Sequence, residues 1–218
     1  MRSSRHRKGR DSMGIKETIA RHLRQPAGFV GKLVGLLMNK GNDFMNRFTI
    51  GIVDPRPGES ILEIGFGNGK YIHEIASKMK TGFVAGVDFS STMVEQARKR
   101  NKAYILQGLV DINLGEVNHI PFESETFNKV FTVNTIYFWP NPANDIREIH
   151  RVLKTDGQLV VSFRSKERME RLEFTKHGFK LYDPEEVIEL VRAAGFREIR
   201  SESAADRVMD VHCVIAVK

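Results

Sequence analysis

The chain has 218 residues, of which 41% are hydrophobic, with 34 lysines and arginines against 27 aspartates and glutamates. This length and composition can build one large domain or two small ones, which excludes a wholly disordered protein. No apolar run reaches the roughly 20 residues that a membrane helix needs, so we expect no membrane span. The single cysteine, Cys213, excludes an internal disulfide and a multi-cysteine zinc site. No secretory signal pattern is visible at the amino terminus, and we expect a cytoplasmic protein.

The formal net charge of +7 is concentrated at the amino terminus. Residues 1–12 carry five basic side chains and one acidic side chain, which accounts for +4 of the total. This Ser/Arg/Gly stretch has no apolar periodicity, so we expect a disordered basic arm or a cloning remnant, with a phosphate-binding arm as the alternative. The rest of the chain is only slightly basic, and we do not expect nucleic acid as the partner.

Two short helices are predicted ahead of the main domain. Residues 29–38 are apolar at helical spacing, and a second amphipathic stretch covers residues 43–53. We assign residues 13–55 to an N-terminal helical lid over a ligand, and residues 56–218 to the main domain. An extra packing layer on the main domain is the alternative role for these helices, and a membrane-surface or partner-binding helix is the third.

Short β-rich runs then alternate with helical segments, which predicts a parallel sheet covered by helices on both faces. A charged, irregular stretch follows at residues 164–180, and after it a helix at residues 184–194. Two final β runs, 197–202 and 208–217, predict an antiparallel pair at one end of the sheet. The other expected strands are 60–64, 83–87, 110–116, 129–134 and 158–163, and the expected helices between them are 71–80, 92–107 and 144–153.

A glycine-rich turn follows the first strand. Residues 61–70 read Ile-Leu-Glu-Ile-Gly-Phe-Gly-Asn-Gly-Lys, so a buried strand passes through Gly65, Gly67 and Gly69 into a helix. In doubly wound sheets, ligands bind beyond the carboxyl ends of the strands, and glycines let the backbone approach them closely. We therefore expect a ligand at this turn.

Two nucleotide-binding motifs fail here. A P-loop requires a glycine where Ile64 stands and a serine or threonine where Tyr71 stands. The dinucleotide fingerprint Gly-x-Gly-x-x-Gly places its third glycine at Lys70. The remaining alternative is a tight turn that binds no ligand.

An acid at the end of the second apolar run argues for a ligand. Asp88 stands 19 residues beyond Gly69, about where nucleoside-binding folds place a carboxylate on the ribose hydroxyls. A carboxylate can accept hydrogen bonds from two vicinal hydroxyls. The alternative role, capping the next helix, is available to Ser90 or Ser91.

These motifs together resemble the class I S-adenosylmethionine-dependent methyltransferases. The pattern Glu-x-Gly-x-Gly-x-Gly at residues 63–69 and Gly-x-Asp at residues 86–88 carry the resemblance. Residues 115–122 resemble the family's segment after the third strand, and residues 126–130 and 148–160 resemble the parts around the fourth and fifth strands. Within the family, the chain is most similar to the small-molecule branch related to ubiquinone and menaquinone biosynthesis.

The resemblance implies a doubly wound α/β fold with a mostly parallel seven-stranded sheet in the order 3-2-1-4-5-7-6. It implies methyl transfer from S-adenosylmethionine to O, N or C of a small, partly apolar molecule, with S-adenosylhomocysteine as product. Glu63 would then hold the methionine end, and Glu116, in place of the commoner aspartate, would accept from the adenine amino group. The expected cofactor-binding residues are Glu63, Gly65, Gly67, Gly69, Asp88, Phe89, Ser90, Met93, Glu116, Val117 and Asn134.

The fourth strand runs into Asn134-Thr-Ile-Tyr-Phe-Trp-Pro140, which is the best substrate-facing candidate. Asn134 would bind cofactor or substrate. Tyr137 is the candidate catalytic residue, because a phenol there could orient or deprotonate a nucleophile, with core packing as the alternative. For Phe138 we expect core packing. The seven histidines contain no pair at metal-ligand spacing, so no metal is expected.

Two other functions remain open. An RNA- or protein-directed methyltransferase-like module would use the basic arm for phosphate affinity that falls with salt. A nicotinamide oxidoreductase is disfavoured, because Lys70 replaces the third glycine and Glu63 would repel a pyrophosphate.

Overall fold

The computed structural model describes residues 43–218 except residues 177 and 206–209. The expected basic arm at residues 1–12 and the expected helix at residues 29–38 lie outside this part of the chain. The second expected helix of the lid segment is present as α3 (Asp43–Val53). No helix in the part of the chain that is described has the length and apolarity to cross a membrane.

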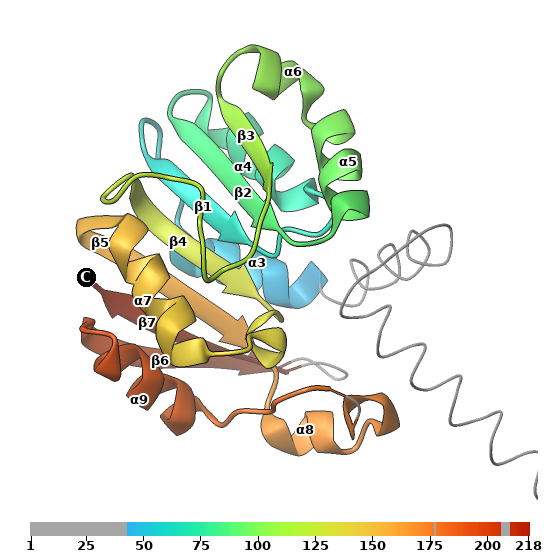
Figure 1. Cartoon of the computed structure of the whole chain (residues 1–218), viewed down its shortest axis with the longest axis vertical. Coiled ribbons are helices and arrows are strands. Elements are labelled where there is room, and N and C mark those ends of the chain that lie inside the picture. Colours follow the sequence, from blue (N-terminus) through green and yellow to red (C-terminus); the bar gives the residue numbers. More distant parts are fainter. Residues whose placement is uncertain (1–42, 177, 206–209) are drawn as a thin grey trace, which may run out of the picture.

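A seven-stranded sheet forms the centre of the fold (Figure 1). Its strands are β1 (Ser60–Ile64), β2 (Phe83–Asp88), β3 (Val110–Leu114), β4 (Phe127–Val133), β5 (Leu153–Phe163), β6 (Arg197–Ala205) and β7 (Asp210–Val217). They lie in the order β3-β2-β1-β4-β5-β7-β6, and β7 pairs antiparallel with both β5 and β6 while the other neighbours are parallel. The predicted order and the predicted antiparallel end are confirmed.

Helices cover both faces of the sheet because successive strand residues point to opposite sides. In β1, Ile61 belongs to a core cluster with residues of α3, whereas Leu62 belongs to a second cluster on the other face. In Figure 1, α7 and α9 lie in front of the sheet, and α3 and α4 lie behind it. The helices after α3 are α4 (Lys70–Met79), α5 (Ser91–Arg100), α6 (Lys102–Leu106), α7 (Pro142–Val152), α8 (Lys166–Glu170) and α9 (Pro184–Ala193), with short 3-10 helices η1 (Ile136–Phe138) and η2 (Glu173–Lys176).

The helix expected at residues 92–107 is broken into α5 and α6 at Asn101. This residue is fully buried, and its side-chain amide donates to the backbone carbonyls of Ala97, at 2.9 Å, and of Gly69, at 3.1 Å. A side chain that binds backbone carbonyls competes with the helical ladder, so the helix ends there. The bond from Asn101 to the Gly69 carbonyl also joins the end of α5 to the glycine-rich turn.

Two further boundaries differ from the sequence prediction. β5 begins at Leu153, directly after α7, because Leu153 pairs with Phe127 at the start of β4. The stretch 164–180, expected to be irregular, contains α8 and η2. Ser165 caps α8, since its hydroxyl accepts from the backbone N–H of Arg168 at 3.3 Å.

Candidate functional site

A pocket opens at the carboxyl ends of β1, β2 and β4, where parallel strands leave the sheet to opposite sides. Each of these strands contributes its last residue or residues and the turn that follows. The loop after β3 and the helices α3, α4 and α5 complete the wall. The lining residues are Asn46, Glu63–Asn68, Tyr71, Val87–Phe89, Met93, Gly115–Asn118, Val133–Thr135 and Phe138–Pro140.

The turn after β1 requires its glycines for two different reasons. All three, Gly65, Gly67 and Gly69, have positive φ, between 57° and 72°. A side chain at Gly65 would also overlap the methyl group of Thr135, and one at Gly69 would lie 2.6 Å from the Cβ of Ala97. Gly67 has open space around it, so only its backbone conformation favours glycine there.

Asp88, at the end of β2, is tied to the glycine-rich turn. Its carboxylate accepts from the backbone N–H of Gly67 at 3.0 Å and from that of Ser90 at 2.9 Å, one bond on each oxygen. Only 7% of the residue is exposed, and this burial raises the pKa of Asp88 to about 6. Each carboxylate oxygen can accept two hydrogen bonds, so both retain capacity for a ligand. The capping role falls to Ser90, whose hydroxyl accepts from the backbone N–H of Met93 at 3.4 Å.

Glu63 lines the same pocket and is 3% exposed. Its Oε2 atom is buried and has no hydrogen-bond partner within the described part of the chain. Burial raises the pKa of Glu63 well above its ordinary value, and the nearby charge of Asp88 raises it further. A buried, unpaired carboxyl group is costly, so a cationic group in the pocket would be stabilised beside it.

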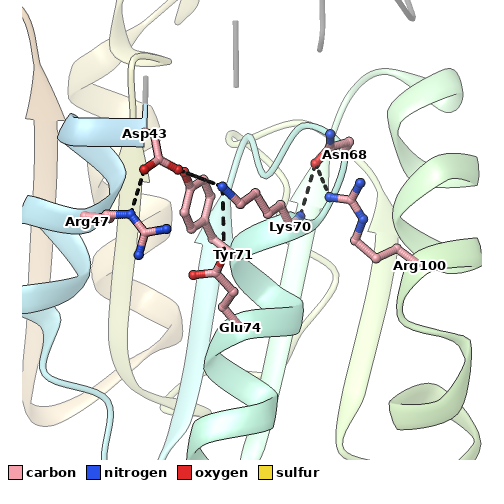
Figure 2. Close-up of polar contacts among 7 residues, drawn as sticks. All are labelled: Asp43, Arg47, Asn68, Lys70, Tyr71, Glu74 and Arg100. Carbon is pink, nitrogen blue, oxygen red and sulfur yellow. Dashed lines mark hydrogen bonds and ion pairs between the residues drawn. The ribbon is translucent and has the colours of Figure 1, made fainter. Parts of the chain in front are cut away.

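A polar network joins the first turns of α3 and α4 at the pocket (Figure 2). Asp43 accepts from Lys70 Nζ at 2.7 Å, from the hydroxyl of Tyr71 at 2.8 Å and from Arg47 Nε at 2.6 Å. These donors hold the pKa of Asp43 well below its usual range. The network fixes α3 so that Asn46, in its first turn, reaches the pocket wall.

Tyr137 belongs to the hydrophobic core and contacts a residue of the pocket wall. It is 3% exposed and does not line the pocket. Its hydroxyl accepts from the backbone N–H of Arg164 at 2.6 Å and donates to Oδ1 of Asn134 at 3.2 Å, and burial raises its pKa. The hydroxyl therefore contacts Asn134, which does line the pocket, and the catalytic role expected for Tyr137 stays a prediction. Phe138, expected in the core, packs against the core and also lines the pocket.

The pocket brings together most of the residues that the sequence singled out. Gly69 and Ser90 do not line it; they are the N-cap residues of α4 and α5, and their expected cofactor contacts stay predictions. Within the described residues, no group of three or more His, Cys, Asp or Glu side chains could hold a metal ion. The predicted residues on the pocket wall are Glu63, Gly65, Gly67, Asp88, Phe89, Met93, Glu116, Val117 and Asn134.

Several wall residues had no clear sequence signal. Asn68 occupies a variable position of the glycine pattern, and Tyr71 served only to exclude a P-loop. Asn118 and Thr135 are small polar residues in loops, where no periodicity marks them. Position inside a recognised motif is the one signal that could have found Asn68.

Comparisons with known proteins indicate one family. A family profile described as a methyltransferase domain matches residues 62–161. The Bacillus subtilis protein named "Putative methyltransferase YrhH" is 31% identical over 166 residues, which cover 76% of this chain and 82% of that protein. The ubiquinone/menaquinone biosynthesis C-methyltransferase UbiE of Geotalea daltonii is 26% identical over 137 residues, covering 62% of this chain and 54% of that protein.

The fold is also similar to the folds of solved structures. The crystal structure of a SAM-dependent methyltransferase from Aquifex aeolicus superposes with a TM-score of 0.63 at 22% identity, covering 79% of this chain and 88% of that one. One family accounts for the strand order, the position of the pocket, the matched domain and the similarity to YrhH. The chain belongs to the class I S-adenosylmethionine-dependent methyltransferases.

Proposed function

We propose that this methyltransferase acts on O, N or C of a small, partly apolar molecule, and that the acceptor binds on the β4 side of the pocket. The observation that carries the proposal is the division of the wall into two parts. Two buried carboxyl groups, Glu63 and Asp88, lie on the β1 and β2 side. Amide, hydroxyl and aromatic groups lie on the β4 side, at Asn134, Thr135 and Phe138.

The β1 and β2 side fits the polar groups of S-adenosylmethionine. The unpaired Oε2 of Glu63 suits the ammonium group of the methionine end. The remaining acceptor capacity of the Asp88 carboxylate suits the two ribose hydroxyls. We assign these roles to the two residues because each supplies an acceptor that the protein itself does not saturate.

The adenine ring is assigned to the wall between β2 and the loop after β3. Met93 and Val117 are buried apolar residues there, and Phe89 is 37% exposed, which suits a flat ring packed between them. Glu116 is exposed at the pocket and is available to accept from the adenine amino group. Its longer side chain replaces the aspartate that is commoner in the family.

The cofactor supplies a methyl group that is already activated by the positive charge on sulfur. The protein therefore needs to align the acceptor and to exclude water, and no dedicated base is obligatory. Trp139 and Pro140 close the pocket with apolar surface, while Asn134 offers an amide to orient the acceptor. Two residues hold the Asn134 amide. Tyr137 donates to the amide oxygen of Asn134, and the amide nitrogen of Asn134 donates to the Met45 sulfur at 3.4 Å.

The acceptor class can be tested by following the methyl group. The protein is incubated with methyl-labelled S-adenosylmethionine and either a small-molecule extract, total RNA or a protein fraction. We expect label in the small-molecule fraction, and less label with Asp88→Ala at a limiting cofactor concentration, because this variant lacks the ribose acceptor. Label that appears in RNA or protein would contradict the proposal and favour a macromolecular acceptor.

A further inference from the structure

Asn68 is the one side chain of the glycine-rich turn that combines burial, a place on the pocket wall and two fixed hydrogen bonds. It is 6% exposed and lines the pocket. Its Oδ1 accepts from the backbone N–H of Lys70 at 3.1 Å and from Nη1 of Arg100 at 2.7 Å. Figure 2 shows both bonds converging on the same oxygen, one from the start of α4 and one from the end of α5.

The two donors determine which way the Asn68 amide faces. If the amide were flipped, its NH₂ group would meet the guanidinium group and a backbone N–H, which are also donors. Oδ1 is therefore held toward Lys70 and Arg100, and Nδ2 is turned away from them. Within the part of the chain that the structure describes, both side-chain hydrogen bonds of Asn68 use Oδ1, so its two N–H donors are available to a ligand.

Arg100 stabilises this orientation of the Asn68 amide. Its bond to Asn68 is charge-assisted, and such bonds are roughly twice as strong as neutral ones. The guanidinium group lies 32 residues away in the sequence, at the end of α5, and burial lowers its pKa without removing its charge. Arg100 does not line the pocket, so it acts on the pocket through Asn68.

We propose that Asn68 Nδ2 donates to the carboxylate of the methionine end of the cofactor, and that Arg100 is the positioning residue that holds the amide in this orientation. The inference rests on the placement of the methionine end beside Glu63 proposed above. The pocket then offers opposite polarity to the two charges of an amino acid: the Glu63 carboxyl group for the ammonium and an amide donor for the carboxylate.

A purely structural role for Asn68, holding the turn through Oδ1, makes a different prediction for Asn68→Asp. Aspartate keeps an acceptor for Lys70 N–H and forms an ion pair with Arg100, so the turn is preserved. It replaces the donor that faces the pocket with an acceptor that repels a carboxylate. A structural role predicts unchanged or tighter ligand binding, and the proposed role predicts weaker binding.

The experiment compares two ligands by calorimetric titration. S-adenosylhomocysteine carries the amino-acid end, and 5′-methylthioadenosine shares the adenosine and sulfur but lacks that end. We expect Asn68→Asp to lower the affinity for S-adenosylhomocysteine at least about tenfold and that for methylthioadenosine less than about twofold. Arg100→Met releases the Asn68 amide. It should lower the ratio of the affinity for S-adenosylhomocysteine to the affinity for methylthioadenosine by about threefold or more.

Asn118→Asp is the matched control, because it places the same charge on the wall after β3. It should leave the ratio of the two affinities unchanged. Thermal unfolding of each variant checks that the fold is kept. An Asn68→Asp protein that loses both ligands equally, or neither, would overturn the inference. A wild-type protein that binds neither ligand would instead overturn the cofactor placement in the proposed function.

Discussion

The backbone N–H of Gly67 donates to Oδ2 of Asp88 at 3.0 Å, which joins the turn after β1 to the end of β2. These residues lie 21 positions apart in the sequence. The bond links the turn assigned to the methionine end with the acid assigned to the ribose. Changes at either residue should therefore alter both stability and ligand binding.

The stability of the protein should depend on pH through Asp88. Burial raises the pKa of Asp88 to about 6 in the folded protein, from an ordinary value of 3.8. Between about pH 3.8 and 6 the folded state thus binds more protons than the unfolded state. Protonation of Asp88 therefore stabilises the folded state fully below about pH 3.8, and this stabilisation is lost as the pH rises through about 6. The loss is at most about 3 kcal/mol, at 1.36 kcal/mol per pKa unit.

Urea unfolding between pH 4 and 7 measures this effect, with Asp88→Asn as the reference that cannot titrate. The free energy of unfolding of the wild type relative to Asp88→Asn should fall as the pH rises. A relative stability that stays constant, or that rises with pH, would show that Asp88 is not desolvated in this way.

Binding of S-adenosylhomocysteine should release protons from Glu63. Burial raises the pKa of Glu63 well above its usual value, which favours the protonated form in the ligand-free protein. An ammonium group beside Glu63 favours the ionised form and displaces that proton. Calorimetry in two buffers with different ionisation enthalpies measures the release. Glu63→Gln should abolish it, and equal release from Glu63→Gln would contradict the assigned partner.

The glycines of the turn should differ in their cost of substitution. Gly67→Ala should lower stability only through its left-handed backbone, by about 1–2 kcal/mol, because no atom lies near the added methyl group. Gly65→Ala adds to that cost a clash with the Thr135 methyl group, for a total of about 2–5 kcal/mol.

Thr135→Ser provides the control for this comparison, because it removes the clashing methyl group and keeps the hydroxyl that contacts Thr132. Thermal or urea unfolding of the double variant Gly65→Ala/Thr135→Ser should bring its cost close to that of Gly67→Ala. A double variant as unstable as Gly65→Ala would show that the overlap with Thr135 is not the cause.

Tyr137→Phe should lower the free energy of unfolding by about 1–3 kcal/mol. The change removes the acceptor of the Arg164 N–H and the donor to Asn134 in a buried setting, and unsatisfied buried groups carry costs of this size. Urea unfolding at neutral pH measures the loss. Unchanged stability would mean that the hydroxyl does not hold this part of the pocket wall.

The family resemblance in the sequence was sufficient to predict the order of the sheet, and the sequence itself marked acidic residues near two strand ends. Glu63 and Asp88 interrupt apolar runs at the points where the chain leaves the sheet, and this pattern is local. The beginning of β5 was not visible, because residues 153–157 read as the end of a helix and a turn, and the strand there depends on pairing with Phe127.

The parts of the site that the sequence did not predict depend on contacts between residues far apart in the sequence. Asn68 and Arg100 are 32 positions apart, and Asp43 and Lys70 are 27 apart. Single polar residues on loops or helix ends carry no periodicity that would indicate such partners. The contacts of Tyr137 could not be predicted for a related reason: the direction of a side chain in a short 3-10 helix depends on what packs around it, here Arg164 and Asn134.

The most direct test of the account is a calorimetric titration of the wild-type protein and of Asp88→Ala with S-adenosylhomocysteine and, separately, with NADH. The wild type should bind S-adenosylhomocysteine at one site per chain and should not bind NADH. Asp88→Ala should bind S-adenosylhomocysteine more weakly by about 1.5–3 kcal/mol, the value of a hydrogen bond to a charged group. Equal affinity of the two proteins, or binding of NADH in place of S-adenosylhomocysteine, would contradict the pocket assigned between β1 and β2.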